Sequence, residues 1–123
     1  MAFLTDRKRV EGLGSAGSGT HHFWTMTVTS VALLVLTPFF LGIVGPLLGA
    51  SHAEVITSLS RPVPAVIVAA YLVVGLHHFR LGVTTVIEDY TRGLSRKIWI
   101  IAMTIVSYGL AAAGIVALAQ IAF

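Results

Sequence analysis

The sequence predicts an all-α membrane protein with three transmembrane helices. Of its 123 residues, 56% are hydrophobic and only 11% are charged, whereas about 25% of the residues of a soluble domain are charged. Three apolar segments are each long enough to cross about 30 Å of hydrocarbon at about 1.5 Å per residue. The chain has no cysteine, which excludes disulfides and thiolate-ligated iron–sulfur clusters within it.

Residues 1–22 are expected to form a cytoplasmic N-terminal tail, followed by a membrane anchor domain over residues 23–123. The tail holds a charged cluster and then a Gly/Ser/Ala-rich run, without the apolar core of a signal peptide. Gly12–Gly17 matches the G-x-G-x-x-G spacing, but no strand precedes it and no acidic residue follows about 20 positions on, so we do not expect a dinucleotide site. The tail also lacks the Arg-rich pattern of a mitochondrial presequence, which favours a bacterial inner membrane over the mitochondrial one.

The expected helices cover about residues 23–49, 64–90 and 98–123. The first and third contain no charged residue, and the second is interrupted only by His77, His78 and Arg80 before its acidic end. A polar loop that ends at Pro62 and Pro64 separates the first two helices. Residues 88–97 connect the second helix to the third.

Basic residues predict the orientation of the three helices. Three lie in the tail and three in the second connection, whereas the first connection has one and the C-terminus none. Three helices place the tail and the second connection on the same side, and the positive-inside rule makes that side cytoplasmic. The C-terminus is then periplasmic. This distribution explains the net charge of +3 without nucleic acid binding.

Small residues at four-residue spacing indicate close helix contacts. Gly45 and Gly49 form one such pair, and Ala113 and Ala117 form another. Three helices make a thin bundle, so these contacts are expected either within the chain or with a second membrane subunit.

The second helix carries the residues that indicate chemistry. At about 100° per residue, His78 and Asp89 share one face and lie about 16 Å apart along the axis, with Gly82 on the same stripe. Histidine is a common axial ligand of haem iron, and Gly82 would leave room for the macrocycle. Alternatively, His78 is a packing histidine that is hydrogen-bonded to a neighbouring helix.

If haem is present, its second ligand must come from a sister subunit. His21 and His22 lie at the membrane edge, His52 lies in the first connection, and His77 points about 100° away from His78. The cofactor would then bridge two polypeptides.

Three further residues of this helix have two or more interpretations. Arg80 would contact a haem propionate, bind a lipid phosphate, or extend to the membrane interface. Tyr90 would donate a hydrogen bond to a quinone, with Asp89 tuning the site or relaying a proton, because quinone reduction requires protons at a wet membrane edge. The alternative for this pair is an interfacial tyrosine beside a solvated carboxylate.

The arrangement His78-x3-Gly82-x6-Asp89-Tyr90 resembles the hydrophobic membrane anchor (D) subunits of succinate dehydrogenase, respiratory complex II. The Gly14–Trp24 segment, the three spans and the chain length also fit this family. The resemblance implies that His78 is one axial ligand of haem b and that Tyr90 binds ubiquinone with support from Asp89.

The resemblance also implies the partners. The cytochrome b556 (C) subunit would supply the second haem ligand, and the flavoprotein and iron–sulfur subunits would oxidise succinate and deliver electrons to quinone. This chain would hold no dehydrogenase site of its own. One departure is the absence of an arginine after Trp24, where many relatives carry one that approaches a haem propionate; Arg80, His22 or the sister subunit would replace it.

Two other functions are compatible with the sequence. The chain could be a haem-free structural or accessory membrane subunit whose polar helix residues hold subunits together. It could also be the anchor of another quinone-linked complex, such as a fumarate reductase or formate dehydrogenase.

Overall fold

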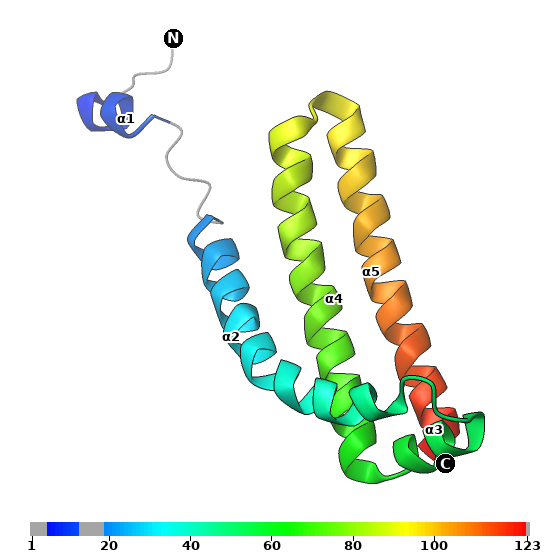
Figure 1. Cartoon of the computed structure of the whole chain (residues 1–123). Coiled ribbons are helices and arrows are strands. Elements are labelled where there is room, and N and C mark those ends of the chain that lie inside the picture. Colours follow the sequence, from blue (N-terminus) through cyan, green and yellow to red (C-terminus); the bar gives the residue numbers. More distant parts are fainter. Residues whose placement is uncertain (1–4, 13–18, 123) are drawn as a thin grey trace.

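The computed structural model describes residues 5–12 and 19–122, which form helices joined by short connections (Figure 1). In chain order, the elements are α1 (Asp6–Glu11), α2 (Gly19–Val44), the 3-10 helix η1 (Gly45–Leu47), α3 (His52–Leu59), α4 (Pro62–Tyr90) and α5 (Gly93–Ala122). No β-strand occurs among these residues, so the predicted all-α fold class is confirmed.

Among the residues that the structure describes, three segments are long and apolar enough to cross a membrane, as predicted. They are Gly19–Leu47, Pro62–Tyr90 and Gly93–Ala122. Each begins before the residue expected from hydropathy, and α2 and α5 do so because their helical hydrogen bonding continues into polar residues that hydropathy excludes. The first turns of α5, for example, include Ser95, Arg96 and Lys97.

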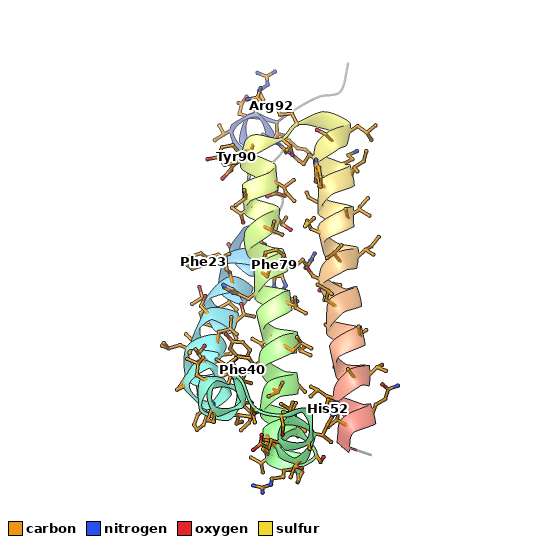
Figure 2. The ribbon with its side chains drawn as sticks, turned by 45° about the vertical axis from the view of Figure 1, so that its right-hand side comes forward. Phe23, Phe40, His52, Phe79, Tyr90 and Arg92 are labelled. Atoms are coloured by element: carbon orange, nitrogen blue, oxygen red, sulfur yellow. The ribbon has the colours of Figure 1, made fainter. Side chains whose placement is uncertain are left out.

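Helix α4 lies between α2 and α5 and contacts both along its length (Figures 1 and 2). The N-terminal end of α2 and the α4–α5 connection lie at one end of the bundle, and α3 and the C-terminal end of α5 lie at the other (Figure 1). At the end that carries the α4–α5 connection, His22 Nε2 of α2 lies 3.3 Å from Thr85 Oγ1 of α4, within hydrogen-bonding distance. The bundle therefore has the up-and-down arrangement that the charge argument requires.

Helix α2 bends in its second half, where Pro38 lies inside it (Figure 1). Proline has no N–H to donate to the carbonyl one turn earlier, and its ring crowds that carbonyl, so a helix kinks there. Beyond the bend, the Phe40 ring stacks on Tyr71 of α4, with ring centroids 4.0 Å apart. This stacking holds α2 against α4 at the end of the bundle opposite to the α4–α5 connection.

The polar loop expected between the first two spans contains a helix, α3. Ser51 and Glu54 form a capping box: the Ser51 N–H donates to Glu54 Oε2 at 2.7 Å, and the Glu54 N–H donates to Ser51 Oγ. The Ser51 N–H, and the Ser51 hydroxyl that donates to the same Glu54 oxygen at 2.8 Å, favour the carboxylate and lower the pKa of Glu54 below its ordinary value. The S-x-x-E signature of this cap is visible in the sequence, so the helix was predictable.

Helices α4 and α5 approach closely along small residues of α5. Ser107 is 0% exposed, Ala111 is buried, and a Cβ added at Gly114 would overlap the Leu72 side chain of α4. Ala113 and Ala117, which have the expected small-residue spacing, are instead exposed. They take no part in this contact and remain available to lipid or another subunit.

Arg96 of α5 closes the end of α4. Its Nη2 donates to the Glu88 carbonyl at 2.9 Å, and its Nε donates to the Thr91 carbonyl at 3.0 Å. Carbonyls at a helix C-terminus lack intrahelical donors, and a cation there also interacts favourably with the helix dipole. Gly93, with φ of 64°, makes the reversal into α5. The side chain of Arg96 therefore holds the segment that carries Asp89 and Tyr90.

We predict that Gly114→Val destabilises the membrane domain by about 1–3 kcal/mol, because the new side chain must displace Leu72. Gly109→Val is the matched control, since a Cβ at Gly109 meets nothing within 4 Å. The measurement is the thermal midpoint of the detergent-solubilised complex that contains each variant. Equal midpoints for the two variants would contradict the close approach at Gly114.

Arg96→Ala is expected to loosen the C-terminal turn of α4 by about 1 kcal/mol, the usual contribution of a partly exposed hydrogen-bonded charge. Hydrogen–deuterium exchange of peptides covering residues 85–95 should become faster in this variant. Lys97→Ala removes the same charge without removing a described hydrogen bond and should leave the exchange rate unchanged. Similar rates in the two variants would show that the capping bonds contribute nothing.

Candidate functional site

His78 lies in the middle of α4 and faces α2. Its Nδ1 is 2.9 Å from the Thr29 Oγ1, and both residues are half-buried. The Thr29 hydroxyl is also 2.9 Å from the Thr25 carbonyl and 3.0 Å from the Met26 carbonyl. Since Nδ1 is engaged, the ring presents Nε2, which has no hydrogen-bond partner among the described residues. The imidazole is thus held by one nitrogen and available at the other.

The described residues contain no group of three or more histidine, cysteine or acidic side chains that could hold a metal ion. A multi-ligand metal site formed by this part of the chain alone therefore does not account for His78. One axial ligand to a haem, completed by a second polypeptide, remains compatible with a single available Nε2. A histidine that only joins two helices is compatible with the same contact.

His77 faces the opposite neighbour, α5. Its Nδ1 is 3.2 Å from the Tyr108 hydroxyl, and the two ring centroids are 6.3 Å apart. Adjacent residues of a helix point about 100° apart, so one histidine contacts α2 and the other contacts α5. The sequence separated the two histidines correctly but did not identify Thr29 or Tyr108 as their partners.

Arg80 also turns towards α5. Its Nε donates to the Thr104 hydroxyl at 3.3 Å, and its guanidinium lies 5.8 Å from the centre of the Tyr108 ring. Among the described residues, no carboxylate lies within ion-pair distance of this side chain. A cation inside a membrane-spanning helix is costly without a counter-charge, so an anion from outside the described part of the chain would stabilise Arg80.

An open cavity of about 280 Å³ collects basic side chains from two helices. It is lined by His21, His22, Thr25, His77, Arg80 and Leu81. His22 was expected at the membrane edge, and its contact with Thr85 places it about two helical turns from His78 along α4. The fold therefore groups Arg80 with the edge histidines rather than with His78.

Gly82 lies on the side of α4 that meets α2. A Cβ added there would be 3.4 Å from the Met26 Cε, which is ordinary van der Waals contact. The space beside Gly82 is therefore occupied by the end of a flexible side chain. Its expected role in haem packing stays a prediction.

Asp89 and Tyr90 end α4 on its exposed surface, and Figure 2 shows Tyr90 close to Arg92 at this end of the bundle. The Tyr90 side chain is 86% exposed. Because α4 is continuous from Pro62 to Tyr90, His78 and Asp89 share one stripe about 16 Å long, as predicted from helix geometry. A ligand at Tyr90 would need a second surface to cover it.

Comparison with known proteins places the chain among membrane anchors. Residues 3–116 match the family described as succinate dehydrogenase/fumarate reductase transmembrane subunit. The chain is 44% identical over 120 residues to the succinate dehydrogenase hydrophobic membrane anchor subunit of Paracoccus denitrificans, covering 98% of this chain and 93% of that protein. It is 28% identical over 88 residues to the subunit of the same name from Rickettsia bellii, covering 72% of this chain and 70% of that one. No solved structure shows significant similarity to it.

Proposed function

The chain belongs to the succinate dehydrogenase/fumarate reductase transmembrane subunit family, and we propose that it contributes one axial ligand of haem b and part of a ubiquinone-reduction site. As a membrane anchor subunit of this family, it associates with the membrane and with catalytic subunits. The proposal makes it the anchor of a succinate:ubiquinone oxidoreductase, in which electrons pass from an iron–sulfur subunit to quinone.

The observation that carries the haem proposal is the contact of His78 with Thr29. An imidazole in a membrane-spanning helix, held by Nδ1 and available at Nε2, has the arrangement expected of an axial ligand. His78 would bind the iron, and the cytochrome b556 sister subunit would provide the opposing histidine. When bound, haem b supplies a one-electron redox centre within the membrane.

The position of Arg80 supports the binding of an anionic group in the half of the membrane that contains His78. It has no described carboxylate partner, and the cavity it lines also holds His21 and His22. A haem propionate or a lipid phosphate would neutralise this cluster. Because Arg80 faces α5 whereas His78 faces α2, the anion need not belong to the group that His78 binds.

Tyr90 would donate its phenolic hydrogen to a quinone carbonyl, with Asp89 supporting the site. Both lie at the end of α4, where protons are available from water, and the exposed Tyr90 side chain leaves room for a partner to form the other wall. An iron–sulfur subunit docked at this end would bring its electrons close to the quinone. Succinate oxidation itself would take place in the flavoprotein subunit, with no dehydrogenase site in this chain.

The distribution of basic residues supports a cytoplasmic location for this end of the bundle and a periplasmic location for the C-terminal end of α5, in a bacterial inner membrane. The organism of the Paracoccus relative is consistent with that location.

A haem-free structural subunit remains the competing function, because a packing histidine would make the same contact with Thr29. The family description also includes fumarate reductase, so an anchor of another quinone-linked enzyme is the other alternative. Haem content separates the first alternative from our proposal, and activity with succinate and ubiquinone separates the second.

His78→Leu should abolish the Soret band of the purified complex and lower its haem-to-flavin ratio. His77→Leu is the matched control: it removes an adjacent imidazole that contacts Tyr108 of α5, and the haem should persist. Haem is measured as the pyridine haemochromogen. A complex without haem, or one that retains its haem after His78→Leu, would favour the structural alternative.

Tyr90→Phe should lower succinate–ubiquinone reductase activity by up to about tenfold, the effect of losing one hydrogen bond of about 1 kcal/mol or slightly more. Reduction of an artificial dye that accepts electrons from the catalytic subunits should be unaffected. Tyr71→Phe, at the other end of α4, serves as the control and should retain both activities. Full quinone reduction by Tyr90→Phe would remove Tyr90 from the proposed site.

A further inference from the structure

The hydroxyl of Thr29 has three possible hydrogen-bond partners but only one proton. The Thr25 and Met26 carbonyls can only accept, and they lie 2.9 and 3.0 Å away. A hydroxyl that donates to one of these carbonyls keeps its lone pairs for a donor. The third partner, His78 Nδ1 at 2.9 Å, is then the donor, and the imidazole carries its proton on Nδ1.

We propose that Thr29 is a positioning residue for the haem ligand, fixing His78 as the tautomer with a lone pair on Nε2. This inference rests on the proposed function, since a tautomer matters only if Nε2 binds iron. The opposite assignment, in which Thr29 donates to Nδ1, would put a proton on Nε2. That form cannot coordinate iron through Nε2, and it would leave a donor without a partner among the described residues.

The Thr29 hydroxyl, which accepts the hydrogen bond from His78 in this assignment, is held rigidly. A β-branched side chain in a helix has few rotamers, and bonding to the carbonyls three and four residues earlier restricts Thr29 further. About one turn away, a Cβ added at Gly82 would be only 3.4 Å from Met26 Cε, so α2 and α4 lie close together at this level. The hydrogen bond to a fixed atom of the neighbouring helix therefore selects the side-chain torsions of His78 and, with them, the orientation of its ring.

This hydrogen bond should tune the metal as well as orient the ligand. A ligating histidine that donates its other N–H to an oxygen is a stronger electron donor, which stabilises oxidised iron and lowers the reduction potential. Water in the hydrocarbon region is scarce, so no solvent molecule readily replaces the hydroxyl. Loss of Thr29 Oγ1 should therefore raise the haem potential or release the haem.

The test uses four variants of the assembled complex. Thr29→Val and Thr29→Ala remove the hydroxyl, and Thr29→Ser retains it. Thr27→Val makes the same chemical change at an exposed position of α2, where the hydroxyl bonds only the Phe23 carbonyl. The readouts are the haem-to-flavin ratio, the haem midpoint potential from redox titration, and the g-values of the oxidised haem by electron paramagnetic resonance.

We expect Thr29→Val and Thr29→Ala to show a more positive potential with altered g-values, or at least a tenfold faster loss of haem, since outer-shell partners of metal ligands typically contribute 10–100-fold. Thr29→Ser and Thr27→Val should match the wild type. Unchanged potential, g-values and haem content in both hydroxyl-free variants would overturn the proposal. So would equal haem loss in Thr29→Val and Thr29→Ser, because the hydroxyl would then not be responsible.

The same experiment distinguishes this inference from the proposed function. If the wild-type complex holds no haem, or its haem survives His78→Leu, the haem role of His78 itself fails. If the haem depends on His78 but is indifferent to the Thr29 hydroxyl, only the positioning role fails.

Discussion

Polar side chains on the central helix must find partners inside a bundle that lies in lipid, and this requirement organises the structure. Helix α4 carries His77, His78 and Arg80 within a single turn of a membrane-spanning segment. Each makes a hydrogen-bonding contact with a hydroxyl on a neighbouring helix, through Tyr108, Thr29 and Thr104 respectively. Because unsatisfied polar groups in hydrocarbon cost several kcal/mol, these contacts fix the rotation of α4 relative to both α2 and α5.

That rotation determines what each face of the helix can do. The face towards α2 presents His78 with one ring nitrogen engaged, and the same stripe continues to Asp89 at the membrane edge. The face towards α5 carries Arg80, a cation without a described carboxylate partner. The side chains of His78 and Arg80 thus contact different neighbouring helices, although the two residues are only two positions apart in sequence.

The bundle is thin, and few of its side chains are covered by the chain itself. Among the described residues, only Leu81, Ile87, Ser107 and Ala111 are buried. The remaining apolar surface faces lipid or other subunits, which fits a membrane anchor that works within a larger complex. Tyr90 illustrates the consequence: its position at the end of α4 is set within this chain, but the other wall of any site around it must come from a partner.

The sequence alone determined the number of spans, the all-α class, the separation of His77 from His78 and the stripe from His78 to Asp89, because these depend on hydropathy and helix periodicity. It also contained the capping signature of α3 at Ser51 and Glu54, which the expectation of a loop overlooked. Only the tertiary structure decided which hydroxyl meets each polar residue and that Arg96 caps the C-terminal end of α4. It also decided which small residues of α5 line the close contact with α4: these are Ser107, Ala111 and Gly114, and not Ala113 and Ala117. The physical reason is that periodicity gives the direction of a side chain around its own helix, whereas its partner depends on the rotation and depth of the neighbouring helix, which three apolar segments leave undetermined.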